Sequence, residues 1–478
     1  MGRPIDRASA KQGRRGSRLC RRRQAAPAAG VLLAAVLVAL AVTATAGAHV
    51  PGTQIWVRTL GSAVSPATGE AVAVGADGEV YLAGGRTEAG KPTLLTRYDA
   101  SGRRRWTATW RSPLGTSRAS AVAISPSGDA YVAGGSENGQ GGNDIVLLKY
   151  SSAGKRLWAR WLSSGPGLFS GANALVVDPA GNAYVVGDNG ASGGLGAAVV
   201  FKYGANGALR WVRYIDQNPS DPQSGSTYGE DIALDGDGNV YVAATTTYAS
   251  SRSSFVAKFA GANGADLGHS GGTVTFGAES GAAALAVRGA EVVLAGWYKA
   301  WDEPDSTVTQ MLVERYDKAL HYEWSVTAAG AGRGASKCND VAIDKAGNVY
   351  AAGATYDQVG ADTRSRAALL KVTPDGKEAW KATYVPGTKT ESWAFGVAVA
   401  GGNAYITGGS QEDAETIDFL TIKYSAAGVR KWTKQWTSSG PGKDFQRGLA
   451  LGPGCVFVGG TGRWGSGASI AVIVKYAR

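Results

Sequence analysis

Histidine, cysteine and methionine are scarce in this sequence. Its 478 residues include three histidines, three cysteines and two methionines. The histidines are His49, His269 and His321, and they stand in unrelated sequence contexts. No His-rich or Cys-rich spacing suits a metal ion, and no phosphate-binding loop of the Walker type occurs. We therefore predict no metal, no cofactor and no catalytic residue set.

Positive charge is scarce beyond the N-terminal segment. The chain has a formal net charge of +11, but residues 1–48 hold nine Lys or Arg and a single acid, Asp6. Residues 49–478 therefore carry only about +3. Nucleic-acid binding needs a basic field on the folded domain. The sequence accordingly predicts no nucleic-acid partner.

Long apolar runs are missing after residue 48, and the run before it has the form of a signal peptide. An Arg-rich segment ends at Arg23, an apolar run follows, and small residues offer cleavage after Ala46 or Ala48. The alternative is an uncleaved membrane anchor, because the uncharged run approaches the thickness of a bilayer. We predict a signal peptide in 1–48 and one domain in 49–478. The mature protein is expected to be a secreted or cell-envelope monomer without membrane contact.

Two cysteines, Cys338 and Cys455, remain beyond the leader. In an oxidising compartment they can pair, but two cysteines so far apart in sequence define no disulfide framework. The other interpretation is two unrelated buried thiols. The sequence leaves both open.

An internal repeat organises the rest of the chain. The stretch "GNVYVA" recurs in variants such as "GDAYVAGG" and "GNAYITGG". Eight such anchors are spaced 50–57 residues apart, a regularity typical of repeat architectures. Their central residues are Tyr81, Tyr131, Tyr184, Tyr241, Leu294, Tyr350, Tyr405 and Phe457.

Each repeat contains four short segments, exemplified by "SAVAI", "DAYVAGG", "DIVLLKY" and "WARWL". They are rich in Val, Ile, Tyr and Trp, alternate between apolar and polar residues, and are joined by Gly-containing connectors. These are strand signals. Four antiparallel strands per repeat predict a propeller blade, so the fold class is all-β, a single eight-bladed β-propeller.

Ring closure is predicted from the two chain ends. The last repeat stops after its third strand, "IAVIVKYAR", and the missing Trp strand is found in "QIWVRTL", residues 54–60. The N-terminal strand would complete the last blade and remove an exposed edge. The fourth strands open with Trp, which we expect to fill the gaps between blades at the rim. These residues are Trp56, Trp106, Trp158, Trp211, Trp324, Trp380 and Trp432, with Leu267 in the fourth repeat.

With its unit written as "D..GN.YV.G…D….KY…G…W", residues 54–478 resemble the bacterial secreted β-propeller repeats called SBBP repeats. The resemblance implies a fold and no particular activity. The turn "YSSAGKRLW", residues 150–158, also resembles the tryptophan-docking turn of quinoprotein propellers. Membership of that enzyme class would imply an adjacent pair of cysteines and a calcium site. This sequence has no adjacent cysteines, so the likeness extends to the turn alone.

The stretch "DGDGN", residues 235–239, spaces oxygen side chains as the start of a calcium loop does. It lacks the Gly at loop position six and a bidentate Glu at position twelve. Other repeats spell the same place "SPSGD" or "DPAGN". We interpret it as a hairpin turn between two inner strands.

Candidate binding residues are expected around the mouth of the central channel, where the longer loops share one face. The residues before the first strands are Glu70, Ser120, Asn173, Glu230, Ala283, Asn339, Phe395 and Arg447, and Asp231 and Asp340 follow two of them. Trp297, Trp301 and Trp393 lie off the rim positions and suit stacking on a sugar or peptide. The alternative is that these polar residues cap strands and the aromatics pack loops. The predicted binding set is Glu70, Asn173, Glu230, Asp231, Trp297, Trp301, Asp340, Trp393 and Arg447.

Function is predicted from the scaffold and from the missing catalytic set. The first hypothesis is a secreted, non-catalytic binding or scaffold protein that recognises a glycan, a peptide or an envelope protein. The rival is a propeller enzyme, either a carbohydrate-active hydrolase or lyase or a degenerate quinoprotein, that uses acids at the channel mouth. A third is a structural envelope protein without a small ligand.

Overall fold

The computed structural model describes residues 49–478 except 89, 164, 166–167, 191–195, 216–224, 249–250, 271–277, 301, 304, 306–307, 360–361, 388–389, 412–414 and 466. The predicted leader therefore lies outside the described residues. The described residues form thirty-two strands. None of the described residues belongs to a helix long and apolar enough to cross a membrane.

Consecutive strands pair antiparallel in sets of four, which we call blades and name by their innermost strand. The β2 blade contains β2 (Ala67–Val74), β3 (Val80–Arg86), β4 (Thr93–Tyr98) and β5 (Arg104–Trp110). The β6 blade contains β6 (Ser117–Ile124), β7 (Ala130–Glu137), β8 (Asn143–Tyr150) and β9 (Arg156–Leu162). The β10 blade contains β10 (Phe169–Val177), β11 (Ala183–Gly190), β12 (Ala197–Tyr203) and β13 (Leu209–Ile215). The β14 blade contains β14 (Thr227–Leu234), β15 (Val240–Thr247), β16 (Arg252–Phe259) and β17 (Asp266–His269).

The second half of the chain repeats this order. The β18 blade contains β18 (Glu279–Arg288), β19 (Glu291–Lys299), β20 (Gln310–Tyr316) and β21 (Tyr322–Ala328). The β22 blade contains β22 (Lys337–Ile343), β23 (Val349–Val359), β24 (Asp362–Val372) and β25 (Glu378–Tyr384). The β26 blade contains β26 (Glu391–Ala400), β27 (Asn403–Gln411), β28 (Asp418–Tyr424) and β29 (Arg430–Trp436). The β30 blade contains β30 (Phe445–Gly452), β31 (Cys455–Trp464), β32 (Ala468–Ala477) and the N-terminal β1 (Gln54–Leu60).

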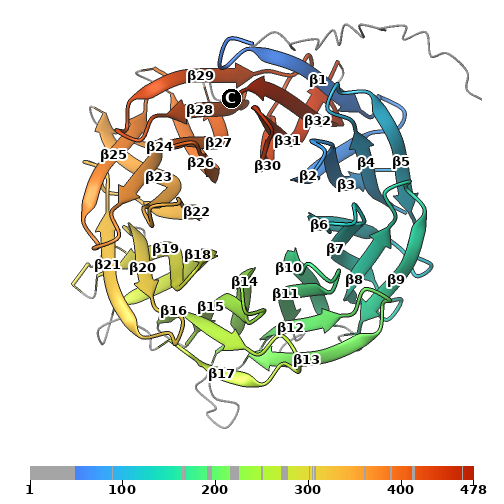
Figure 1. Ribbon diagram of the computed structural model, residues 1–478. Coiled ribbons are helices and arrows are strands. Elements are labelled where there is room, and N and C mark those ends of the chain that lie inside the picture. The colour runs from blue at the N-terminus through green and yellow to red at the C-terminus, as the bar shows by residue number, and fades with distance from the viewer. Residues whose placement is uncertain are drawn as a thin grey trace, which may run out of the picture. The chain divides into compact units, whose positions relative to one another are not determined.

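The blades of residues 49–478 surround a central opening, with their first strands innermost (Figure 1). The all-β propeller class is confirmed. A single parallel pair, Phe169 with Asn143, joins the β6 and β10 blades into one sheet of eight strands. Hydrogen bonding thus gives seven sheets among the described residues, and the predicted count of eight blades stays a prediction.

The N-terminal strand closes the ring as expected. Strand β1 pairs antiparallel with β32, from Gln54 opposite Tyr476 to Leu60 opposite Ala471. The buried side chains form clusters that each combine two neighbouring blades, such as Trp211 of the β10 blade with Phe255 of the β14 blade. The hydrophobic core is therefore formed mainly by apolar side chains that pack between neighbouring blades.

One register prediction is wrong by one residue. Strand β19 places Val293 opposite Ala286, as Tyr81 stands opposite Ala73 in the β2 blade. The fifth anchor is therefore Val293 and not Leu294. The segment "VVLAG" is continuously apolar, so its pattern does not distinguish the two faces of the sheet.

The rim tryptophans dock on the next blade. The indole N–H of Trp106 on β5 donates to the Ser152 carbonyl oxygen at 2.9 Å, in the turn that precedes β9. Arg97 on β4 donates to the same oxygen at 2.6 Å. The ring lies on Gly154, where an added Cβ would be 2.6 Å from it, and Gly154 has φ +84°. Only glycine combines that dihedral with so close an approach.

This arrangement recurs at five further junctions, with a Trp and a Lys or Arg of one blade bonded to one turn carbonyl of the next, whereas the indole N–H of Trp432 has no such partner among the described residues. The acceptors are Ala100 for Trp56 and Lys475, Ala205 for Trp158 and Lys149, Gly261 for Trp211 and Lys202, Pro374 for Trp324 and Arg315, and Ala426 for Trp380 and Lys371. The rim tryptophans are thus interblade packing residues, as predicted.

Two paired substitutions change the junction between the β14 and β18 blades. Leu267 stands at the Trp position on β17 and is 46% exposed. In the facing turn Leu320 takes the place of glycine, with φ +67° and 7% exposure. Because no indole covers this turn, a side chain fits there and packs into the interblade core. Lys258 still donates to the Lys318 carbonyl oxygen at 2.6 Å.

We expect Gly154→Ala to destabilise the protein more than Gly238→Ala. Both glycines have φ near +80°, but an added Cβ at Gly238 meets nothing within 4 Å. The shared backbone strain costs about 1–2 kcal/mol, and the clash with Trp106 adds about 1–3 kcal/mol. Urea unfolding of the two variants measures the difference. Equal losses of stability would show that Trp106 docking contributes nothing.

Candidate functional site

The first strand of every blade carries a β-bulge at its channel-mouth end, between residues such as Gly69 and Ala71 of β2. A bulge leaves its extra residue out of the ladder and redirects the side chain. The skipped residues are Glu70, Ser120, Asn173, Glu230, Ala283, Asn339, Phe395 and Arg447. The structure thus places all eight residues at equivalent points around the channel.

Three of the bulge residues donate hydrogen bonds to the next blade. Ser120 Oγ donates to the Ala172 carbonyl oxygen at 2.5 Å, and Asn173 Nδ2 donates to that of Gly229 at 2.7 Å. Asn339 Nδ2 donates to the Ala394 carbonyl oxygen, also at 2.7 Å. These side chains therefore tie neighbouring blades together at the mouth.

Asp231 and Asp340 also bond to the next blade. Asp231 accepts the N–H of Ile232 and, across the junction, that of Leu285, both at 2.8 Å. Asp340 accepts the N–H of Val341 at 2.8 Å and that of Val397 at 2.7 Å. Each carboxylate thus uses both oxygens on backbone donors, so both residues serve the fold.

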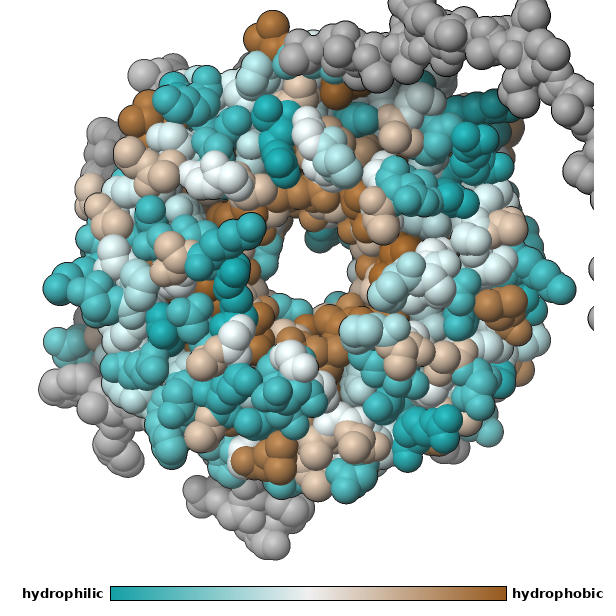
Figure 2. Space-filling view, in the orientation of Figure 1, coloured by the Kyte–Doolittle hydropathy of each residue, from teal (hydrophilic) through white to brown (hydrophobic). Residues whose placement is uncertain are grey.

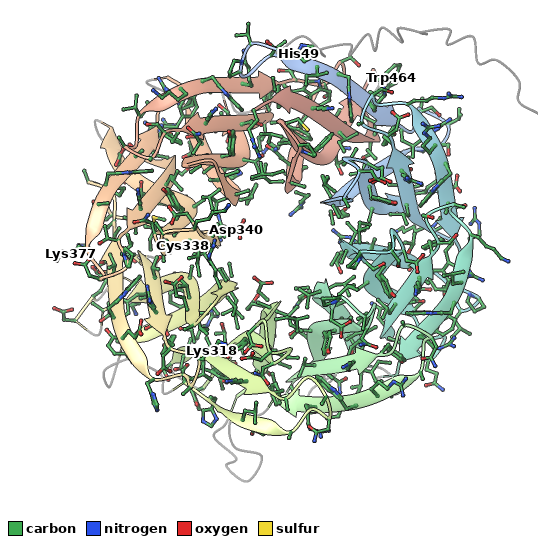
Figure 3. All side chains as sticks on the ribbon, in the orientation of Figure 1. His49, Lys318, Cys338, Asp340, Lys377 and Trp464 are labelled. Carbon is green, nitrogen blue, oxygen red and sulfur yellow. The ribbon has the colours of Figure 1, made fainter. Side chains whose placement is uncertain are left out.

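The surroundings of these two acids favour their neutral forms. Burial raises the pKa of Asp231 to about 6. Burial, together with the negative charge of Asp231, raises the pKa of Asp340 to about 7. Asp340 stands at the inner edge of the ring (Figure 3). The channel wall thus contains acids that change charge near neutral pH.

Glu70 of the β2 blade forms ion pairs with residues of both neighbouring blades. Its Oε2 lies 3.1 Å from Arg118 Nη2 of the β6 blade and 3.9 Å from Arg447 Nε of the β30 blade. Two predicted residues, Glu70 and Arg447, are thereby brought together. Arg118 keeps 69% of its side chain exposed, so this cation remains open to solvent.

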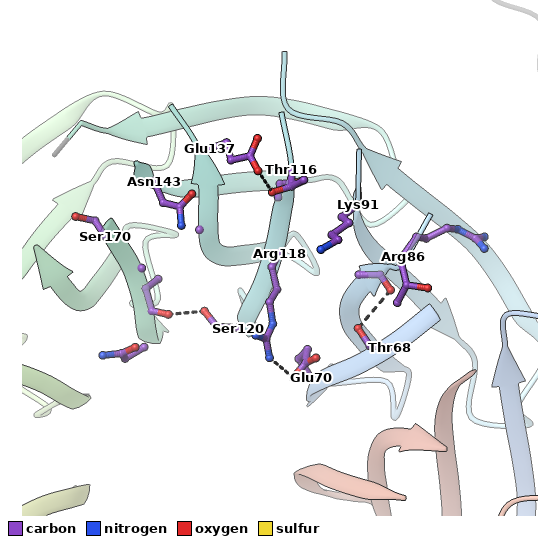
Figure 4. A pocket seen from close by; sticks show the side chains of 17 residues that line it. Thr68, Glu70, Arg86, Lys91, Thr116, Arg118, Ser120, Glu137, Asn143 and Ser170 are labelled. Atoms are coloured by element: carbon purple, nitrogen blue, oxygen red, sulfur yellow. Dashed lines mark hydrogen bonds and ion pairs between the residues drawn. The ribbon is translucent and has the colours of Figure 1, made fainter. Parts of the chain in front are cut away.

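A cavity of about 830 Å³ lies at the mouth between the β2, β6 and β10 blades (Figure 4). We call it the polar cavity. Thirteen of its seventeen lining residues have hydroxyl, amide or charged side chains, and they include the predicted Glu70 and Asn173. Its other charged residues are Arg86, Lys91, Arg118 and Glu137. Sequence reasoning missed these four, because single repeats do not show which strand ends face one cavity.

Two smaller cavities lie farther around the same mouth and share Trp297 and Arg252. One of about 220 Å³ also includes Glu230, and one of about 350 Å³ includes Lys337. The structure thus brings Glu230 and Trp297 together. Burial, with the charges of Asp188 and Asp231, raises the pKa of Glu230 to about 7.

The other predicted aromatics lie elsewhere. Trp393 packs edge-on against Phe395, with ring centroids 6.3 Å apart, and covers Gly409. It lines none of these three cavities. Trp301 lies outside the described residues. The hydrophobic side chains visible on the face in Figure 2 gather around the central opening.

The "DGDGN" segment forms the turn between β14 and β15. Asp235 Oδ1 accepts the N–H groups of Asp237 and Asn239 at 2.9 and 2.8 Å. Its Oδ2 accepts Asn239 Nδ2 at 2.9 Å and the Tyr241 hydroxyl at 3.2 Å. The carboxylate therefore organises a hairpin, and the anchor tyrosine of the repeat reinforces it.

The two cysteines of the described residues are unpaired. Cys338 and Cys455 are both buried free thiols in different interblade clusters. Burial raises the pKa of Cys338 to about 12. Of the two interpretations, separate buried thiols describe the structure.

Asp340→Asn should change how stability depends on pH. The folded pKa of Asp340 is raised, so its contribution is greatest below about pH 4 and is lost as pH rises through about 7. Relative to the variant, the native protein should lose roughly 1–3 kcal/mol over that interval. Urea unfolding across the range tests this, with the exposed-turn variant Asp77→Asn as control. Parallel profiles for the native protein and Asp340→Asn would contradict it.

Comparisons with known proteins agree with the fold. Residues 211–248 match the SBBP beta-propeller repeat family. A europium-containing methanol dehydrogenase superposes with a TM-score of 0.53 and 11% identity, over 88% of this chain and 93% of that one. Chaetomium thermophilum Sqt1, in a structure bound to the N-terminus of ribosomal protein L10, superposes with a TM-score of 0.51 and 13% identity, over 86% of this chain and 97% of that one. No curated protein sequence matches. At these identities the likeness to the solved structures shows the fold alone: the chain is a β-propeller, and its residues 211–248 match the SBBP repeat.

Proposed function

We propose that this protein is a secreted, non-catalytic binding protein that holds a polar ligand, a glycan or a peptide, at the channel mouth. The observation that carries the proposal is the polar cavity. Its volume of about 830 Å³ lies in the range of small-ligand sites, about 300–1,000 Å³. Three blades form its walls, so the site is held on rigid strand ends.

The lining suits a ligand rich in hydroxyl, carbonyl or acidic groups. Arg118 and Lys91 are exposed at the cavity, and Arg86 is oriented by bonds from its Nη1 to Ser65. Glu137 on β7 accepts the Thr116 hydroxyl at 2.6 Å, which fixes an acceptor in the same cavity. Charged donors and acceptors in fixed positions give specificity for polar groups.

One observation favours the enzymatic alternative. Glu230 has a pKa raised to about 7 and lines a cavity beside Trp297, the setting of a general acid. The acids beside it, Asp231 and Asp188, are engaged by backbone N–H groups of Leu285 and Gly229. The two carboxylates that could act as the second catalytic acid are thus bound to the backbone. For this reason we prefer the binding function to the enzymatic one.

Arg118→Ala should weaken ligand binding about tenfold, because a charge-assisted contact is lost. A glycan and peptide array identifies the ligand, and titration calorimetry measures the change. Arg156→Ala, an exposed arginine at the start of β9, is the matched control. Equal affinity of both variants would exclude the polar cavity as the binding site.

Turnover of any arrayed glycan that disappears in Glu230→Gln would establish the enzyme instead. A third reading, a structural envelope protein, is supported if no ligand binds.

We also propose that residues 1–48 direct export and are removed. The Arg-rich start, apolar run and small residues before His49 support this. Mass spectrometry of the exported protein should find an N-terminus at Gly47 or His49. An intact leader on membrane-bound protein would favour the anchor.

A further inference from the structure

The β18 blade has an aromatic residue where the other blades have none. Trp297 on β19 stands opposite Gly281 on β18 in the strand ladder. At the equivalent ladder positions the second strands have Gly85, Gly135, Asp188, Thr245, Ala354, Gly409 and Thr461. Three of these pairs carry an aromatic residue on the first strand instead, namely Tyr228, Trp393 and Phe445, and the β18 blade alone carries it on the second strand.

The indole of Trp297 has a fixed position. A Cβ added to Gly281 would come within 2.3 Å of Trp297 Nε1, so the ring lies directly against the backbone of β18. The side chain is half-buried and lines both smaller cavities at the mouth. One part of the ring is thus held by the sheet, and the rest presents an aromatic surface to the cavities.

Cations from three blades surround this ring. We call the larger of the two cavities the Trp297 groove; Arg252 of the β14 blade, Lys299 of the β18 blade and Lys337 of the β22 blade line it. Lys299 Nζ lies 3.3 Å from Glu279 Oε1, and Glu279 is the one acid among the described lining residues. Arg252 and Lys337 are exposed. The groove therefore carries positive charge beyond what its own acid balances.

We propose that the Trp297 groove binds an anionic saccharide, with a sugar ring stacked on Trp297 and its acidic substituent held by Arg252 and Lys337. A pyranose ring has an apolar C–H face that matches an indole, and its carboxylate or sulfate matches exposed cations. An acidic peptide has the charge but no comparable ring, so the saccharide is the better fit. This site lies on the proposed binding face but uses residues outside the polar cavity, so the two proposals can fail separately.

Titration calorimetry with tetragalacturonate tests the groove. We expect binding that weakens with added salt, because exposed charges are screened, and much weaker binding of neutral cellotetraose. A sulfated tetrasaccharide in a second arm tells whether carboxylate or sulfate is preferred. Trp297→Ala should weaken binding about tenfold and Arg252→Ala about fivefold. Trp297→Phe should restore most of the loss, and Arg156→Ala should leave binding unchanged.

Several outcomes would overturn the assignment. Equal binding of cellotetraose would remove the role of charge, and equal binding of tetraglutamate would assign the groove to acidic peptides. If Arg118→Ala abolishes binding and Arg252→Ala leaves it unchanged, the ligand binds in the polar cavity and not in the Trp297 groove. Melting temperatures of all variants show whether they fold, and Arg252→Ala tests the groove even if Trp297→Ala does not. No binding of either acidic saccharide would refute the proposal.

Discussion

The contact between a rim tryptophan and the turn of the next blade sets the geometry of the ring. One carbonyl oxygen accepts both the indole N–H and a Lys or Arg side chain, as Ser152 does for Trp106 and Arg97. A glycine beneath the ring allows the two blades to approach. Repeated around the ring, this contact fixes the spacing of the blades at the rim. The bulge and Asp contacts, such as Asp340 with Val397, join the blades at the channel.

The junction between the β14 and β18 blades shows how the contact changes when its components change together. The loss of the indole at Leu267 accompanies the replacement of glycine by Leu320, whose side chain then fills the interblade core. The lysine bond to the Lys318 carbonyl oxygen is retained, and the Tyr241 hydroxyl oxygen lies 3.1 Å from the same oxygen. A left-handed leucine costs about 1–2 kcal/mol in backbone strain, which its burial offsets.

The sequence was sufficient for features that depend on local pattern and on chain order. The strands follow from alternation, and the pairing of Trp56 with the last strand follows from one missing segment. Bulges could not be predicted, because they arise from the register between two strands. The roles of Asp231 and Asp340 were obscured for the same reason, since their partners Leu285 and Val397 lie more than fifty residues away. The polar cavity needs three blades placed side by side, which no single repeat encodes.

The closure of the ring by β1 also constrains how the chain reaches its native state. Strand β1 is synthesised before every other strand described here, yet its partner β32 is the last. Trp56 of β1 pairs with Lys475 of β32, almost the whole described chain away in sequence, and pairings of such sequence separation form slowly. Until β32 has been synthesised, β1 has no partner strand and remains an unpaired edge. The nascent protein therefore passes through a long open state in which premature pairing of that edge is the principal hazard.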